Sequence, residues 1–247
     1  MPSTEAIFRE DSYLKEAEAK VIDVTGSGGV VLDRTIFYAT SGGQPGDTGK
    51  ILRADGSVIA IAATVTGATK DEIIHVPAEG QALPEIGETV RLEIDWERRY
   101  RLMKMHTACH LLSVIYAFPI TGAAVSEDDS RVDFDFPEGA QYSKEEATAK
   151  LAEMIAANYP VFTTWISEQE LAANPGLVKS KNVRPPQGMG RIRLVGIGEN
   201  ASIDSQPCGG THVAATSEIG EIHIGKIEKK GKENRRFRIR FGPVPAV

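Results

Sequence analysis

Short runs of alternating hydrophobic and polar residues, separated by glycine, make up most of the first 95 positions of the chain. This alternation is typical of strands that bury one face. The strands expected from it span residues 19–24, 30–32, 51–52, 58–65 and 89–94. Several short strands at this spacing favour a small β-barrel or a sandwich.

From Trp96 the apolar residues recur every three or four positions, which is the period of a helix. The apolar stripe consists of Leu102, Met105, Cys109, Leu112 and Tyr116. We therefore expect a largely buried helix that ends before Pro119. Within it, we interpret Cys109 as a buried small hydrophobic residue.

Strand and helix patterns alternate in the remainder of the chain. Strands are expected over 132–136, 161–166, 191–197 and 201–204. Helices are expected after Ser143, which begins a capping box with Glu146, and over 167–173. The chain ends in a hairpin with a bulge near Gly225. The mixture predicts an α+β fold with two domains, residues 1–95 and 96–247.

The composition is that of an ordinary globular protein, with 247 residues, 41% hydrophobic and 25% charged. No run of about 18 apolar residues suggests a membrane span, and the first residues lack the features of a signal peptide. Two cysteines do not make a disulfide framework. We therefore expect a cytoplasmic protein without a membrane partner.

Two pairs of residues have the spacing of metal ligands. His106 and His110 are four residues apart, so on a helix both imidazoles project from one face. Cys208 and His212 repeat this spacing about a hundred residues later. Three imidazoles and one thiolate suit a tetrahedral zinc ion. Either pair alone could be a coincidence, but together they form a candidate metal site.

Only five histidines occur in the chain, and three of them fall in these pairs. His75 and His223 remain, and we interpret both as surface or strand residues. Because the ligand pairs come from distant parts of the chain, the metal would lie between structural elements, where a substrate can reach it. Zinc can lower the pKa of a bound water or polarise a carbonyl, and both favour ester hydrolysis. If all four residues bound the zinc ion together, no coordination position would be left for water or substrate. Hydrolysis would then need the zinc to accept a fifth ligand, or the ion would act mainly by positioning water and substrate.

A glycine-rich segment, residues 37–49, lies among the N-terminal strands. Its characteristic residues are Gly42, Gly43, Gln44, Asp47 and Gly49. Glycine lets the backbone turn tightly and approach a ligand closely. By itself the segment is typical of a turn-rich loop.

Basic residues are concentrated near the C-terminus. The net charge is −6, yet the segment from Lys226 to Arg240 has a local charge of +6, which leaves −12 for the remainder. Strand alternation places Arg236, Arg238 and Arg240 on one face. Such a face is either a contact surface for a phosphate backbone or a solvated strand face, and charge alone leaves both open. A second basic cluster, which is a second candidate surface for contact with a phosphate backbone, contains Arg98, Arg99, Arg101 and Lys104.

Three motifs together carry a resemblance to a known family. They are residues 37–49, the HxxxH motif at His106–His110 and the CxxxH motif at Cys208–His212. They closely resemble the motifs of the alanyl-tRNA synthetase editing domain, and above all those of its freestanding relatives, the AlaX editing proteins of medium length. The chain departs from the common pattern at Ser41, where a third glycine is frequent, and at Cys109, where threonine is frequent.

The resemblance implies an N-terminal β-barrel followed by a two-layer α/β editing domain with an antiparallel sheet and helices. It also implies that His106, His110, Cys208 and His212 hold zinc. The implied reaction is deacylation of mischarged tRNA(Ala), with Ser-tRNA(Ala) as the expected substrate and Gly-tRNA(Ala) as a second one. No nucleotide cofactor is expected. From the charge pattern, and not from the resemblance, we expect the tRNA backbone to contact Arg236, Arg238, Arg240, Lys229 and Lys230.

An editing pocket must retain serine and reject alanine. A polar group that bonds the serine hydroxyl does so, because a methyl group leaves it unpaired. Thr35, Gln44 and Asp204 are the polar candidates near the motifs, although a turn or capping role is open for each.

Two other functions fit the same residues. In the first, Cys208 is a nucleophile activated by His212, in a thiol hydrolase that needs no metal. In the second, the chain is a zinc-stabilised RNA-binding module without catalysis.

Overall fold

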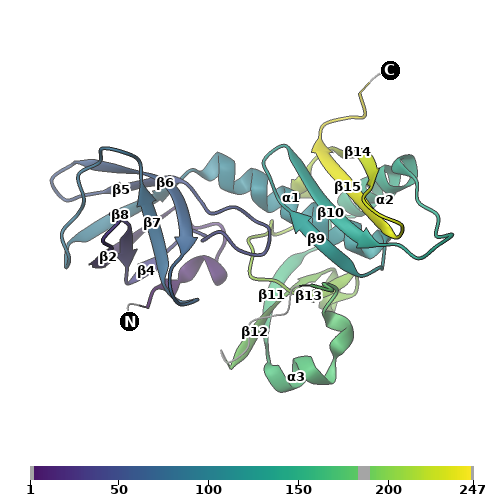
Figure 1. Cartoon of the computed structure of the whole chain (residues 1–247), viewed down its shortest axis with the longest axis horizontal. Helices are drawn as coiled ribbons and strands as arrows, with labels where there is room; N and C mark the ends of the chain where they lie inside the picture. Colours follow the sequence, from purple (N-terminus) through teal and green to yellow (C-terminus); the bar gives the residue numbers. More distant parts are fainter. Residues whose placement is uncertain (1–2, 183–189, 246–247) are drawn as a thin grey trace. The chain divides into compact units, whose positions relative to one another are not determined.

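The computed structural model describes residues 3–182 and 190–245 (Figure 1). The chain divides into two compact units, residues 1–100 and 101–247, and the division falls within helix α1 (Trp96–Ile115). In the described part of the chain, no helix has the length and apolar character needed to cross a membrane.

The first unit is built around a closed β-barrel. Its elements are β1 (Glu5–Ala6), η1 (Ile7–Arg9), β2 (Glu16–Val24), β3 (Val30–Leu32), β4 (Arg34–Thr35), β5 (Gly49–Leu52), β6 (Val58–Thr66), β7 (Ile73–Pro77) and β8 (Thr89–Ile94). The barrel closes in the order β2-β3-β7-β6-β5-β8, with antiparallel neighbours throughout. The sequence left a barrel and a sandwich open, and the closed sheet, which has no free edge, shows that the unit is a barrel.

Alternation along the strands fills the barrel interior. In β6, Ile59 and Ile61 are buried while Val58 and Ala60 point outward. The same period buries Val90 and Leu92 in β8 and Ile51 in β5, and these side chains form one core cluster. Five of the six barrel strands were expected from the sequence pattern, and only β7 was not.

The second unit contains two antiparallel sheets and the helices that cover them. Its elements are β9 (Ile120–Ala124), β10 (Asp129–Asp135), α2 (Lys144–Ala156), β11 (Val161–Ser167), α3 (Glu168–Ala173), η2 (Pro175–Leu177), β12 (Arg191–Ile197), η3 (Glu199–Ala201), β13 (Asp204–Pro207), η4 (Thr216–Ile219), β14 (Ile222–Lys229) and β15 (Asn234–Phe241). The sheet orders are β14-β15-β10-β9 and β11-β12-β13. The α+β fold class with an N-terminal barrel is confirmed.

Helix α1 is buried along its predicted stripe. Leu102, Met105 and Leu112 are fully buried, and Cys109 is 6% exposed, as expected for a small core residue. Just past the helix, the Tyr116 ring packs on Phe237 of β15 with 4.7 Å between ring centroids. The helix is thereby fixed against the larger sheet.

The predicted capping box of α2 forms only in part. The Ser143 hydroxyl accepts a hydrogen bond from the backbone N–H of Glu146, at 3.2 Å. The Glu146 side chain pairs instead with Lys150, one turn along, at 2.7 Å. A complete box begins α3, where Ser167 and Glu170 bond each other's backbone N–H groups.

Two further predictions have opposite outcomes. The bulge near Gly225 is confirmed, because the β14–β15 register shifts between Ile224 and Lys226. The strand over 201–204 is wrong. Asn200 and Ala201 have positive φ and form a turn, so the strand begins only at Asp204.

Candidate metal centre

The two sequence motifs meet in the second unit. Helix α1 carries His106 and His110 one turn apart, and the segment after β13 carries Cys208 and His212. The Cys208 Sγ atom lies 3.6 Å from Nε2 of His106 and 3.4 Å from Nε2 of His212. One possible ligand atom from each of the four residues lies within 4.8 Å of the others.

This spacing fits a zinc ion. Zinc–sulfur and zinc–nitrogen bonds of about 2.3 and 2.05 Å separate neighbouring corners of a tetrahedron by about 3.5 Å. The two sulfur–nitrogen distances, 3.6 and 3.4 Å, match that edge. The three imidazoles are buried, so their positions are fixed by packing. These four residues could therefore hold a metal ion.

Thr107 selects the tautomer of His212. Its hydroxyl donates to the backbone oxygen of Met103, one turn back on α1, at 2.9 Å. The same hydroxyl oxygen lies 3.1 Å from Nδ1 of His212 and must accept there, because its proton is already used. His212 therefore carries its proton on Nδ1, which leaves Nε2 with a free lone pair facing Cys208.

Arg193 of β12 holds the segment that carries Cys208. Its Nη1 atom donates to the backbone oxygens of Cys208 and Gly210, both at 2.9 Å. The Gly210 N–H points at the Cys208 sulfur at 3.4 Å. These contacts fix the thiol against the imidazoles.

Asp204 lies next to the Nδ1 atom of His110. Its Oδ2 atom is 3.3 Å from Nδ1 of His110, which is within ion-pair distance, although the two atoms do not form a hydrogen bond. Lys179 contacts Oδ1 at 2.5 Å, and the Gln206 amide donates to Oδ2 at 2.7 Å. A carboxylate facing the distal nitrogen is a common partner of a metal-binding histidine.

The charges of this network shift its pKa values. Burial alone would raise the pKa of Asp204, but His110 and Lys179 lower it by more, so that the pKa falls to about 2. Burial lowers the pKa of His110, yet Asp204 and Cys208 raise it to about 9. Burial also raises the pKa of Cys208, and the neighbouring imidazoles outweigh this effect and bring it well below the ordinary thiol value. A thiolate is the form that binds metal.

No sequence pattern marks Lys179 or Arg193 as part of the site. Lys179 precedes Ser180, which forms an isolated bridge with Ile120, and no motif marks it. Arg193 belongs to a correctly predicted strand, but no known sequence motif links a residue at this spacing to Cys208. Only the folded chain brings these cations to the centre.

Thr35 and Gln44 lie in the barrel unit, and both are buried. The Thr35 hydroxyl is 2.7 Å from Nε2 of His75, whose Nδ1 donates to the Val30 backbone oxygen at 3.0 Å. His75 thus accepts the Thr35 proton at Nε2. His75 and His223 both lie in strands and are buried, so the surface alternative for them is wrong.

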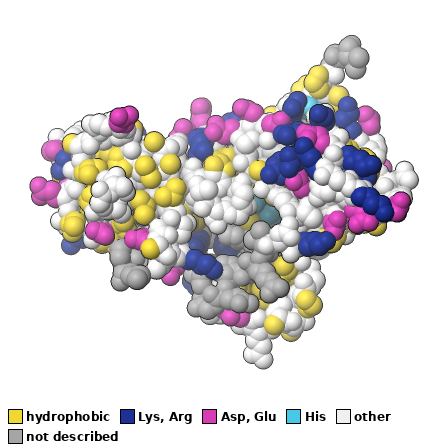
Figure 2. Space-filling model, viewed as in Figure 1, with side chains coloured by type: hydrophobic (Ala, Val, Ile, Leu, Met, Phe, Trp, Pro, Cys, Tyr) yellow, Lys and Arg dark blue, Asp and Glu magenta, His cyan; other side chains and the backbone are white. Residues whose placement is uncertain are grey.

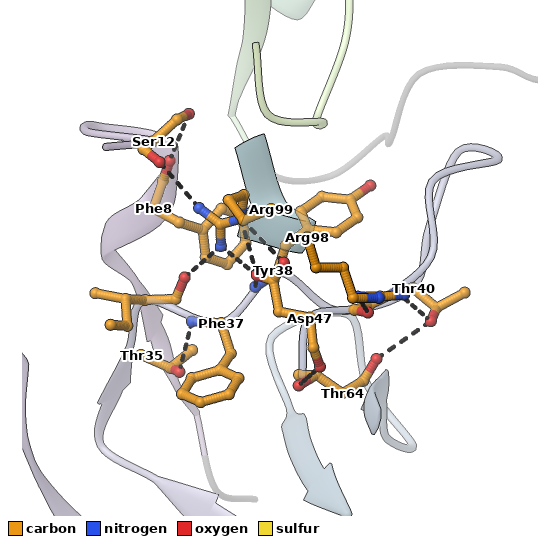
Figure 3. A network of polar contacts seen from close by, with 12 residues as sticks. Phe8, Ser12, Thr35, Phe37, Tyr38, Thr40, Asp47, Thr64, Arg98 and Arg99 are labelled. Carbon is orange, nitrogen blue, oxygen red and sulfur yellow. Dashed lines mark hydrogen bonds and ion pairs between the residues drawn. The ribbon is translucent and has the colours of Figure 1, made fainter. Parts of the chain in front are cut away.

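The glycine-rich segment is organised around Asp47 (Figure 3). The Asp47 carboxylate accepts from the Tyr38 backbone N–H at 2.6 Å and forms a buried ion pair with Arg99. Arg99 also donates to the Ile36 and Ser12 backbone oxygens, at 2.7 and 3.0 Å. One side chain of α1 therefore fixes the two ends of the segment.

Glycine is required within this segment for two reasons. Gly43 has φ +84°, in the left-handed region, and a Cβ atom at Gly49 would overlap the backbone oxygen of Glu93. Ser41, in contrast, does not have a positive φ. The serine that replaces a frequent glycine therefore adds no backbone strain.

The second basic cluster is not a uniform cationic surface. Arg99 is fully buried in its pair with Asp47. Arg98 donates to the Gly46 backbone oxygen at 2.8 Å. Arg101 pairs with Asp128 at 2.5 Å and lies over the Phe241 ring. The interpretation of Arg99 as a nucleic-acid contact is wrong, because its charge is neutralised inside the barrel unit.

The C-terminal arginines share one face of the larger sheet, but carboxylates lie between them. Arg236 makes two hydrogen bonds to Asp133, at 2.8 and 2.9 Å. Arg238 bonds Glu228 at 2.5 Å, and Arg240 bonds Asp129 at 2.8 Å. Figure 2 shows basic and acidic side chains intermixed over this sheet. The strands β10 and β14 thus reduce the charge that β15 presents.

Comparison with known proteins gives two family matches. The family described as "tRNA synthetases class II (A)" matches residues 4–98, and "Threonyl and Alanyl tRNA synthetase second additional domain" matches residues 192–238.

Individual relatives extend over nearly the whole chain. The alanyl-tRNA editing protein AlaX-M of Methanosarcina mazei is 39% identical over 244 residues, covering 95% of each chain. AlaX-M of Saccharolobus solfataricus is 34% identical over 237 residues, 94% of this chain and 97% of its own. An alanine–tRNA ligase of Pyrobaculum aerophilum is 38% identical over 93% of this chain but only 26% of the ligase. The chain therefore belongs to the AlaX-M family of alanyl-tRNA editing proteins.

Proposed function

We propose that this protein is a zinc-dependent trans-editing hydrolase that deacylates tRNA(Ala) mischarged with serine, and also with glycine. The observation that carries the proposal is the convergence of His106, His110, Cys208 and His212 on one point. Relatives of the same length are named alanyl-tRNA editing proteins. The assignment of zinc rests on the donor set, three imidazoles and a thiolate.

Zinc, when bound, supplies a Lewis acid that polarises the ester carbonyl or lowers the pKa of water. The chain's own residues orient the ligands. Thr107 fixes the protonation of His212, and Asp204 faces the distal nitrogen of His110. Arg193 holds the backbone around Cys208. Partners of this kind orient metal ligands, and their loss weakens metal binding.

Selection of serine over alanine requires a polar group that a methyl cannot satisfy. Thr35 and Gln44 remain our candidates, whereas Asp204 is assigned to the support of His110. The Thr35 hydroxyl donates to His75 and accepts from the Phe37 backbone N–H at 3.0 Å, so only its second lone pair is left to accept from a serine hydroxyl. In this scheme the glycine-rich residues Gly42, Gly43, Asp47 and Gly49 shape the segment that presents Gln44.

The deciding experiment measures serine release from Ser-tRNA(Ala), beside Gly-tRNA(Ala) and Ala-tRNA(Ala), with and without a zinc chelator. We expect rapid, chelator-sensitive loss of serine and glycine, while alanine is spared. Release of alanine at the same rate would contradict an editing function.

Replacement of His106 tests the metal centre directly. We expect His106→Ala to abolish deacylation, because one of the four ligands is lost, while thermal unfolding remains cooperative. An unchanged rate would overturn the proposal. Loss of folding on metal removal, without ester cleavage by the wild type, would favour the RNA-binding module.

The thiol hydrolase is a second candidate, favoured by the 3.4 Å contact between Cys208 and His212 and by the low pKa of Cys208. It predicts activity that survives chelation but is lost in Cys208→Ser. A zinc hydrolase, in contrast, would lose activity both on chelation and in Cys208→Ser. Cys109→Ala serves as the matched control, because this second cysteine is buried outside the cluster.

A further inference from the structure

One row of side chains crosses the small sheet β11-β12-β13 at the metal centre. Trp165 of β11 lies opposite Arg193 of β12. The backbone N–H of Cys208 bonds the Arg193 oxygen at 3.2 Å, which continues the β12–β13 register by one residue. Residues opposite each other in an antiparallel sheet point to the same face. Trp165, Arg193 and Cys208 therefore share a face and a row.

That face is the one directed toward helix α1. Gln206, two residues before Cys208 on the same face, donates to the Ser113 hydroxyl of α1 at 3.3 Å. The distance along the row follows from the strand spacing of about 4.8 Å. Two spacings place Trp165 about 10 Å from Cys208, on the metal side of the sheet.

Trp165 is half-buried and carries a cation on its ring. The Arg191 guanidinium lies 4.2 Å from the centre of the Trp165 ring. Arg191 is two residues before Arg193 and so shares the same face of β12. The guanidinium covers one face of the indole. Nucleobases stack on aromatic rings and on arginine guanidiniums alike, and a guanidinium also attracts phosphate by charge.

We propose that Trp165 and Arg191 form the binding site for the terminal adenine of the aminoacylated RNA end. This proposal rests on the proposed function, because the ester to be cleaved is attached to the ribose of that adenosine. A separation of about 10 Å leaves room for the ribose between the base at Trp165 and the ester at the metal centre. Arg191 supplies the positive charge that the adjoining phosphate requires.

The kinetic test compares two serine esters, seryl-adenosine (the 3′-ester) and serine ethyl ester, which lacks the base. Stacking on an aromatic side chain contributes about 1–3 kcal/mol per base, so Trp165→Ala should raise KM for seryl-adenosine about 5- to 100-fold. Hydrolysis of the ethyl ester should stay unchanged, and Trp165→Phe should restore most of the loss. Equal loss on both esters would mean a merely structural role and would overturn the proposal.

The binding test does not depend on catalysis. The chain has two tryptophans, so Trp96→Phe leaves Trp165 as the only indole reporter. We expect the trinucleotide CCA to quench its fluorescence, and CCU to quench it less. Arg191→Gln should weaken CCA binding more than Arg191→Lys does. Quenching by adenosine monophosphate but not by CCA would assign the site to a free nucleotide and overturn the RNA assignment.

A matched control comes from the other sheet of this unit. Arg235 lies over the Tyr142 ring at 5.4 Å and forms an exposed arginine–aromatic pair of the same kind. Tyr142→Ala should leave KM for seryl-adenosine unchanged. If the wild type cleaves no ester while CCA still quenches Trp165, the proposed function fails and the base site stands. If esters are cleaved but neither Trp165→Ala nor CCA gives a signal, only the base site fails.

Discussion

Asp204 keeps a negative charge in a buried position because Lys179 and the His110 ring face its two carboxylate oxygens. Lys179 contacts one carboxylate oxygen at 2.5 Å, and the His110 ring faces the other at 3.3 Å. This geometry makes Asp204 a positioning residue for His110. The carboxylate orients the ring and increases the basicity of its opposite nitrogen.

We expect Asp204→Asn to weaken zinc binding about 10- to 100-fold, since the loss of an outer partner has effects of this size. Competition with a chromogenic chelator measures the affinity without reference to catalysis. Asp135→Asn is the matched control, because Asp135 pairs with the exposed Lys181 outside the metal centre. Equal affinity of the wild type and Asp204→Asn would exclude this role.

His75 provides a pH-dependent contribution to stability. Burial lowers its pKa from 6.5 to about 4, although the bond to the Val30 backbone raises it slightly. Between pH 6.5 and 4 the unfolded chain binds the extra proton and the folded chain does not, so stability falls as the pH falls through this range. The full loss is about 3 kcal/mol, reached near pH 4.

The measurement is urea unfolding at pH 7.0 and 4.5 for the wild type and His75→Gln. The variant should show a smaller difference between the two pH values. An NMR titration of the wild-type imidazole gives a second test, and a His75 midpoint near 6.5 would contradict the burial argument.

At the residue scale, the convergence of His106, His110, Cys208 and His212 could be expected from the sequence, because the i, i+4 spacing of each pair carries that information. The role of Asp204 was not, because sequence separates it from His110 by 94 positions. Lys179 was missed for the same reason. Supporting contacts depend on tertiary packing, which has no local pattern.

The glycine-rich segment depends on one element, helix α1. Arg99, in the first turn of that helix, reaches Asp47 and the Ile36 backbone. Because both charges are buried, removal of one leaves the other without compensation. The segment is therefore held by the ion pair as well as by its glycines.

Arg99→Met should reduce the free energy of unfolding by about 3–5 kcal/mol, the usual cost of an unpaired buried charge. Chemical denaturation gives the value. Arg91→Met is the control, because Arg91 is half-exposed in its pair with Glu93 and such pairs contribute about 1 kcal/mol or less. Similar losses in the two variants would argue against the buried network.

Elements with a strong period were predicted well. β12 and the bulge of the terminal hairpin agree with the sequence pattern, and α1 begins at the expected Trp96. The false strand over 201–204 arose because a non-glycine residue, Ala201, adopts a left-handed conformation. Propensity gives no warning of such a turn.

The whole molecule is acidic, with a net charge of −6, so attraction to RNA depends on where its cations lie. Arg236, Arg238 and Arg240 of β15 are each paired with a carboxylate from a neighbouring strand. We keep the proposal that Arg236, Arg238, Arg240, Lys229 and Lys230 contact the tRNA backbone. The pairs mean that each phosphate contact would compete with an existing bond.

Neutralisation of Arg236 and Arg238 tests this surface. The double variant to glutamine should lower the slope of log K against log salt for tRNA binding by about 2, if both contact phosphates. Arg53→Gln is the control, because Arg53 makes a similar two-bond pair with Glu88 in the barrel unit. An unchanged slope would place the RNA elsewhere.

The two cysteines differ in a way that bears on oxidation. Burial raises the pKa of Cys109 to about 12, so its thiol stays protonated and inert. Cys208 has a low pKa and is partly exposed. In the metal-free chain Cys208 would therefore be the more reactive of the two thiols toward oxidants, and its oxidation would remove a candidate metal ligand. Zinc bound there, as proposed, would shield this sulfur from irreversible oxidation.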